Sequence, residues 1–129
     1  MNNKEKISKE LENFCRNIEK WFRGETQDQK LLYETIMSGF SSDFSMLNGD
    51  GVSITLAMFS DWLPTVFGQF PDRSVQIEDV EIHYSNDHGL ATFTEIQITG
   101  TVSNQRSSSA VFLLTQEKAL WFHLIEKWI

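Results

Sequence analysis

The final stretch of the sequence alternates in the way that an extended chain inside a sheet does. Residues 121–128 divide into two sets that would face opposite sides: Trp121, His123, Ile125 and Lys127, and Phe122, Leu124, Glu126 and Trp128. Successive side chains of a β-strand point to opposite faces, and aromatic and β-branched residues are enriched in strands. The pattern predicts a terminal strand that lies within a sheet.

Further alternating segments precede this one: Val75–Tyr84, Leu90–Val102 and Ser107–Thr115. The phase slips inside the first of them, so we expect a β-bulge near Glu78 and Asp79. The residues between the segments are polar or contain glycine, as turns do: 86–89, 103–106 and 116–119. Together these segments predict an antiparallel meander of four strands.

The N-terminal part of the chain has the periodicity of helices instead. Between Lys4 and Phe22 the apolar residues recur at steps of three and four, which places them on one face of an amphipathic helix. Gly24 is suited to end that helix. A second apolar group, from Leu31 to Met37, predicts a shorter helix.

The segment after these helices predicts a strand, a turn and a third helix. Residues 40–47 alternate apolar and polar side chains, and 48–51 read Asn-Gly-Asp-Gly, a strong turn signal. Ser53 is placed to cap a helix over 54–63. Pro64 has no backbone N–H, so we expect the helix to end there.

Helices grouped early in a chain and antiparallel strands grouped late are typical of an α+β domain. We predict one domain over residues 1–129, with the N-terminal helices packed on a strongly curved, mostly antiparallel sheet that forms a cone. The chain has 129 residues, 40% of them hydrophobic, which is enough to bury a core without metals or disulfides.

The charge of the chain argues against two classes of partner. Its net charge is −7, with eleven Lys and Arg residues scattered along the sequence. Contacts to phosphates dominate nucleic-acid affinity, and an acidic domain is poorly equipped to make them. Anionic membrane surfaces repel the same charge. We therefore expect neither nucleic acid nor a membrane as a partner.

Location and cofactors are predicted from the cysteine count and from signals that we do not find. Cys15 is the single cysteine, which suits a reducing compartment. We see no secretory leader, and no apolar run approaches the roughly 20 residues that span a bilayer. The three His residues and Cys15 show none of the spacings of zinc sites. We predict a cytoplasmic protein without a metal or another cofactor.

Three features together resemble the nuclear transport factor 2-like superfamily, also called the cystatin-like α+β cone. They are the long helix followed by a short one, the segment FSSDFSMLNGDG at 40–51, and the terminal Trp121-x-His-x-Ile-x-Lys-Trp128. The last two are similar to the first and the closing strand of that superfamily, and the resemblance covers essentially the whole chain. Its members include ketosteroid isomerase-like, polyketide cyclase-like and SnoaL-like domains. One fold hosts many activities, so the resemblance implies the fold and leaves the activity to the site.

At the positions that the resemblance marks as functional, this chain departs from the isomerase-like pattern. Those enzymes carry an Asp general base just before the turn that follows the first strand, where this chain has Asn48. At the closing strand, two positions that hold His in many relatives hold Ile125 and Lys127, and His123 stands where an aliphatic residue is usual. These departures count against isomerase-type chemistry.

Two residues are candidates for acid–base chemistry: His123 and Glu95. If the face of Trp121 and Ile125 lines the cone, His123 would project into an apolar pocket, where burial can move its pKa across neutrality. A histidine with a satisfied hydrogen bond in the core or at an interface is the favoured alternative. An inward Glu95 would have a raised pKa, but we expect it to face outward as a solvated charge.

Aromatic residues supply the candidates for ligand binding. Four of them gather near helix ends and the Pro64–Pro71 segment, where the mouth of a cone would lie: Trp21, Trp62, Phe67 and Phe70. They could form the rim of an apolar pocket or simply plug its open end. Tyr33 and Tyr84 could offer hydroxyl groups to the same ligand, and His123 completes this candidate set.

The sequence supports a noncatalytic domain that binds a small molecule or another protein and forms a homodimer. The later strands carry apolar residues on both faces, and a two-fold interface is the simplest way to cover a bare sheet face. The alternative is an acid–base enzyme, such as an isomerase, cyclase or dehydratase, that acts on a small hydrophobic substrate through His123 and Glu95.

Overall fold

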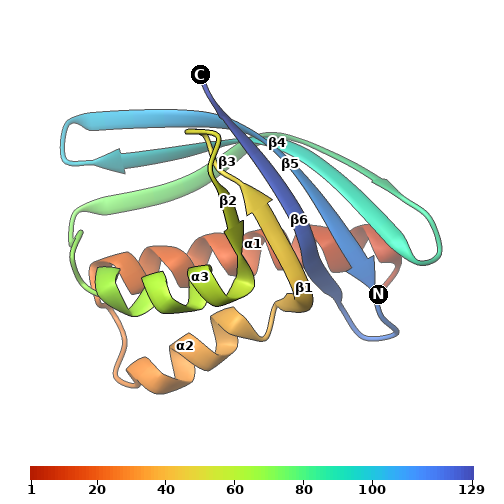
Figure 1. Ribbon diagram of the computed structural model, residues 1–129, viewed down its shortest axis with the longest axis horizontal. Coiled ribbons are helices and arrows are strands. Elements are labelled where there is room, and N and C mark those ends of the chain that lie inside the picture. The colour runs from red at the N-terminus through yellow and green to blue at the C-terminus, as the bar shows by residue number, and fades with distance from the viewer.

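Three α-helices lie on one face of a six-stranded sheet in the computed structural model, which describes all residues from Met1 to Ile129 (Figure 1). The elements in chain order are α1 (Asn3–Arg23), α2 (Gln29–Met37), β1 (Phe40–Leu47), β2 (Ser53–Thr55), α3 (Leu56–Trp62), the 3₁₀ turn η1 (Leu63–Val66), β3 (Arg73–Tyr84), β4 (His88–Thr99), β5 (Val102–Leu114) and β6 (Ala119–Trp128). This is the α+β arrangement that the sequence predicts.

Helix α1 runs beneath the sheet and presents one apolar face to it (Figure 1). Asn2 caps its N-terminus, because the Asn2 side chain accepts a hydrogen bond from the Glu5 N–H. Gly24 ends the helix in the left-handed conformation at φ 72°, as predicted. The residues at the predicted spacing are the buried ones: Ile7, Leu11, Ile18, Trp21 and Phe22.

The strands are arranged in the order β2-β1-β6-β5-β4-β3. Neighbouring strands are antiparallel except β1 and β6, which are parallel. The last strand, β6, lies inside the sheet between β1 and β5. The terminal strand predicted from the alternation is confirmed. Its central place explains why its inward side is buried.

The register of the sheet shifts at three places: in β1 between Phe40 and Ser45, and at β-bulges in β3 and β6. In β3 the register with β4 shifts between Glu78 and Glu81, and Asp79 has φ 54°. This bulge lies where the slip in the alternation predicts it. In β6 the register with β5 shifts at Phe122, because Val111 pairs with His123 while Phe112 pairs with Trp121. The second bulge was not predicted.

Two elements differ from the prediction. Residues 53–55 form the short strand β2 against the end of β1, and Thr55 rather than Ser53 caps α3 by accepting a hydrogen bond from the Met58 N–H. Residues 103–106, expected as a turn, belong to β5. The actual turn is at Gly100 (φ 62°) and Thr101. Polar side chains on these strand segments conceal the apolar alternation that identifies a strand.

The core fills the space between α1 and the concave face of the sheet. Its fully buried members include Ile7, Ala91, Ala110 and Phe112. Gly89 lets α1 lie close to β4, because a Cβ atom there would meet the end of the Ile7 side chain, which would have to shift. The helices leave the opposite face of the sheet uncovered (Figure 1). No helix combines the length and apolar character needed to cross a membrane.

Candidate functional site

A cavity of about 500 Å³ lies between the concave face of the sheet and helices α1 and α3. Drug-sized ligands bind in cavities of roughly 300–1,000 Å³. The residues that line it come from seven elements and the turn after β1: Phe14, Ile18, Phe22, Met46, Asn48, Val52, Ile54, Met58, Phe59, Trp62, Glu95, Gln97, Arg106, Leu124 and Glu126.

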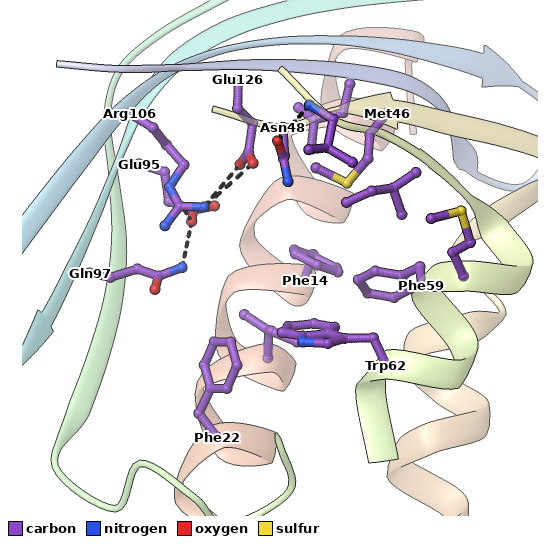
Figure 2. Close-up of a pocket in the computed structure, with 15 residues that line it drawn as sticks. Phe14, Phe22, Met46, Asn48, Phe59, Trp62, Glu95, Gln97, Arg106 and Glu126 are labelled. Carbon is purple, nitrogen blue, oxygen red and sulfur yellow. Dashed lines mark hydrogen bonds and ion pairs between the residues drawn. The ribbon is translucent and has the colours of Figure 1, made fainter. Parts of the chain in front are cut away.

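The cavity has apolar walls on the side of the helices. Phe14 and Phe22 reach it from α1, and Phe59 and Trp62 reach it from α3 (Figure 2). Trp62 is 44% exposed, so its ring stands at the mouth of the cavity. These walls suit an aromatic or aliphatic group.

Polar side chains gather at the other end, on the strands. Figure 2 shows Glu95, Gln97, Arg106 and Glu126 directed toward one another and into the cavity. Arg106 Nη1 lies 3.4 Å from Glu126 Oε1, and Arg106 Nε lies 3.6 Å from Glu95 Oε2. Gln97 Nε2 donates to Glu95 Oε2 at 2.8 Å. We call these four residues the polar cluster.

The polar cluster is well buried for charged groups. The side chains of Arg106, Glu95 and Glu126 are 15%, 13% and 7% exposed. Arg106 is further held by Asn104 Oδ1, which accepts from its Nη2 at 3.1 Å, and by the Trp128 ring, 4.6 Å from its guanidinium carbon. Such packing fixes the guanidinium between the two carboxylates.

Glu126 is the unusual acid of the cluster. Burial and, to a lesser extent, the Glu95 carboxylate raise its pKa, Arg106 lowers it, and the net pKa is about 7. A carboxyl whose pKa lies near neutrality can hold or release a proton under physiological conditions. It is therefore the group in this cavity best suited to exchange a proton.

Asn48 adds a hydrogen-bond donor beside Glu126. Its Oδ1 accepts hydrogen bonds from the backbone N–H groups of Asp50 and Val52, both at 3.0 Å. The amide is thereby oriented, and its Nδ2 points into the cavity (Figure 2). The residue that stands where the isomerase-like enzymes have an Asp thus lines the cavity as a neutral donor.

Of the candidate acid–base residues, the structure brings only Glu95 into the cavity. The expectation that Glu95 faces outward is wrong, because β4 presents Ala91, Phe93, Glu95 and Gln97 to the same concave face. His123 is half-buried and does not line the cavity, and its Nδ1 lies 3.1 Å from Ser45 Oγ. The bulge at Phe122 turns His123 away from the face of Trp121, so the two candidates do not meet.

The aromatic candidates divide between three places. Trp62 lines the cavity. Trp21 is 1% exposed and packs edge-on against Phe67, with ring centroids 4.7 Å apart, so these two rings fill the end of the cone. Phe70 packs against Phe22 and lies 3.7 Å from the Arg73 guanidinium carbon. Trp21, Phe67 and Phe70 therefore do not line the cavity, although Phe22, which packs against Phe70, does.

The two tyrosines also lie outside the cavity. Tyr33 lines a second hollow of about 390 Å³ with Trp21, and its hydroxyl donates to the Ser60 carbonyl at 3.3 Å. Tyr84 is 54% exposed at the end of β3. No group of three or more His, Cys, Asp and Glu side chains is arranged to hold a metal ion.

Sequence reasoning missed Arg106, Gln97 and Glu126. Arg106 was assigned to a turn, and Glu126 was placed on the face opposite Trp121. The sequence did contain a signal for Arg106. The buried face of β5 is formed by every second residue, Phe112, Ala110 and Ser108, and the next position in that series is Arg106. For Glu126 no local signal exists, because only the pairing with β5 reveals the bulge at Phe122.

The fold and the cavity define an α+β cone with a ligand-sized interior, and solved structures share this fold. An NTF2-like protein of unknown function from Pseudomonas aeruginosa is 22% identical, with a TM-score of 0.88 over 95% of this chain and 98% of its own. A candidate dehydratase of the NTF2-like family from Streptomyces avermitilis is 14% identical, with a TM-score of 0.78 over 98% of this chain and 96% of its own.

A third similar structure is an NTF2-like protein with a cystatin-like fold from Novosphingobium aromaticivorans, 9% identical, with a TM-score of 0.77 over 98% of this chain and 82% of its own. No family profile and no curated protein sequence matches the chain. The chain therefore has the NTF2-like, cystatin-like fold, as the sequence resemblance implies.

Proposed function

We propose that this domain binds a small, largely apolar molecule in the cavity between α1, α3 and the sheet. The observation that carries the proposal is the cavity itself: about 500 Å³, with aromatic walls at one end and the polar cluster at the other. Binding sites combine apolar surface with a few oriented polar groups, because the surface supplies affinity and the polar groups fix orientation. A core that served stability alone would gain by filling this space.

Blocking the cavity is expected to abolish binding. Met46 is half-buried on β1 and lines the cavity, so Met46→Trp should place an indole ring inside it. We expect saturable binding of small aromatic molecules by the unmodified protein in saturation-transfer NMR, and no binding by Met46→Trp. Leu31→Trp is the matched control, because Leu31 is 59% exposed on α2 and should leave binding unchanged. Equal binding by both variants would contradict the proposal.

Acid–base catalysis in the same cavity is the second candidate function. The observation in its favour is Glu126, whose pKa of about 7 suits proton transfer, opposite a second carboxylate that Arg106 holds in place. The similarity to the candidate dehydratase from Streptomyces avermitilis is compatible with this reading. Here Glu126 and Glu95 replace the pair of His123 and Glu95 as the proposed working residues.

We also propose that the uncovered face of the sheet joins two copies of the chain. It carries exposed or half-buried apolar side chains that alternate with the core residues of β4, β5 and β6: Leu90, Ile98, Val111, Leu113 and Ile125. Apolar patches of this kind on a soluble protein mark interaction sites. A second copy is the simplest partner, because a two-fold axis makes one patch complementary to itself.

Charging this face should separate the two copies. Val111→Glu would place a carboxylate on β5 between Leu90 of β4 and His123 of β6, and burying it in an interface would be unfavourable. We expect light scattering after gel filtration to find twice the 14.9 kDa chain mass for the unmodified protein and 14.9 kDa for Val111→Glu. Leu31→Glu, on exposed α2, should remain a dimer. A monomeric unmodified protein would contradict the proposal.

A further inference from the structure

We propose that the molecule bound in the cavity carries a positively charged amine, and that this ammonium group binds against the carboxylates of Glu126 and Glu95. The inference rests on the proposed binding function and adds the chemical class of the ligand: an aromatic or aliphatic group of about cavity size that ends in an ammonium.

The first argument is the charge at the polar end of the cavity. Two carboxylates, Glu95 and Glu126, share the single guanidinium of Arg106. When both acids are ionised, the polar cluster therefore carries a net charge of about −1. Buried charges are costly unless they are paired. A cationic group of the ligand would supply the missing partner.

The second argument is the hydrogen bonding of Glu126. Its two oxygens receive only Arg106 Nη1, at 3.4 and 3.5 Å, which are long distances for a charge-assisted hydrogen bond. A carboxylate can accept about four hydrogen bonds. Because Glu126 is 7% exposed and its carboxyl faces the cavity, a ligand there can supply the donors that the protein does not (Figure 2).

The other charged and titratable groups near Glu126 do not neutralise the excess negative charge of the polar cluster. Glu95 faces it from β4 and Arg106 from β5. From α1, Cys15 lies near Glu95, but burial and that carboxylate raise its thiol pKa to about 12, so it stays neutral. Arg73 of β3 lies near enough to Arg106 for burial and that charge to lower its pKa, but it contacts Thr99 Oγ1 and the rings of Phe22 and Phe70 and forms no ion pair with Glu95 or Glu126. Asn48 offers a donor without charge.

The aromatic walls suit the rest of such a ligand. If the ammonium binds at the polar end, the carbon skeleton of the ligand would contact the apolar residues that line the rest of the cavity, which include Phe14, Phe59, Trp62 and Leu124. Aromatic faces also attract cations, so these walls do not oppose its entry. The overall charge of −7 favours the approach of a cation and disfavours an anion of the same shape.

Three probes with one skeleton and different head groups test the inference: phenylpropylamine, phenylpropanol and phenylpropionate. By isothermal titration calorimetry near pH 8, we expect the amine to bind at least about tenfold more tightly than the alcohol, and the carboxylate to bind most weakly. Glu126→Gln keeps the shape and removes the charge, so it should erase the preference for the amine while the alcohol still binds. Glu117→Gln, on an exposed turn, is the control.

The affinity for the amine should also depend on pH. Because the pKa of Glu126 is about 7, its carboxylate form becomes more populated between about pH 6 and about pH 8. The amine keeps its charge over that range, so its affinity should rise with pH while that of the alcohol stays constant. Glu95→Gln provides a second variant with the same expected loss of preference if Glu126→Gln does not fold.

The outcomes separate this inference from the proposed function. If the alcohol or the carboxylate binds as tightly as the amine, the cavity is a binding site but the inference about the ligand is wrong. If none of the three probes binds to the unmodified protein, both the inference and the proposed binding function are contradicted. A preference for the amine that persists in both Gln variants would show that the polar cluster is not its source.

Discussion

Replacing Arg106 with methionine is expected to lower the free energy of unfolding by about 3–5 kcal/mol near pH 8. Methionine keeps most of the length of the side chain but removes the charge that lies between Glu95 and Glu126. Both carboxylates would then remain buried without a cation, and removing one partner of a buried pair costs more than the pair itself contributes. Urea denaturation at several pH values measures the loss.

The loss should depend on pH because Glu126 titrates near neutrality. Its pKa of about 7 lies above the usual 4.5, so Glu126 contributes stability that is fully present below about pH 4.5 and is lost as pH rises through 7. Arg106 lowers this pKa, so without it Glu126 should keep its proton to higher pH. The difference in the free energy of unfolding between the unmodified protein and Arg106→Met should therefore shrink to about 1 kcal/mol near pH 5.

A second substitution separates charge from packing. Adding Glu126→Gln to Arg106→Met removes one of the two unbalanced acids and should restore part of the stability near pH 8. Arg16→Met is the matched control, because Arg16 is exposed on α1 and its change should stay within about 0.5 kcal/mol. A loss of stability in Arg106→Met that is the same at every pH would contradict the electrostatic account of the cluster.

Trp21→Ala is expected to destabilise the fold by about 3–5 kcal/mol. Trp21 is 1% exposed, its indole N–H donates to the Leu63 carbonyl at 2.7 Å, and its ring contacts Tyr33 and Phe67. Alanine would leave a cavity at the end of the cone and an unsatisfied carbonyl in it. For a chain of this size the melting temperature should fall by on the order of 10–20 °C in calorimetry.

Trp62→Ala is the informative comparison, because it removes the same side chain from the mouth of the cavity. Trp62 is 44% exposed, so less apolar surface is lost and the stability should change by about 1 kcal/mol. The aromatic wall of the cavity disappears, however, and binding of aromatic probes should weaken. If Trp62→Ala destabilised the fold as much as Trp21→Ala, it would be wrong to assign Trp21 to the stability of the fold and Trp62 to ligand binding.

Much of the fold could be predicted because its elements are recorded in local patterns. The apolar face of α1, the glycine that ends it, the strand at 40–47 and the slip at Glu78 and Asp79 all depend on residues a few positions apart. Helix and strand periods place side chains on faces independently of the rest of the chain. The class of fold follows from the order of those elements.

The candidate site was predictable only in part. The sequence singled out Glu95 and Trp62, but it placed Glu95 on the outer face and gave no reason to join them to Arg106. The four residues of the polar cluster come from the consecutive strands β4, β5 and β6, and their meeting depends on the register in which these strands pair. No pattern within one segment carries information about such a meeting.

The last strand shows where local information ends. Its alternation by itself predicted a strand within the sheet over residues 120–129, because a period of two with aromatic residues is typical of a β-strand, and the structure has this strand at Ala119–Trp128. The alternation could not determine which half faces the helices. In the tertiary structure, pairing with β5 inserts a bulge at Phe122, and Trp121, Leu124 and Glu126 then share the buried face while His123 leaves it. One extra residue exchanges the two faces of a strand, and only the contacts with its neighbours decide where that residue is placed.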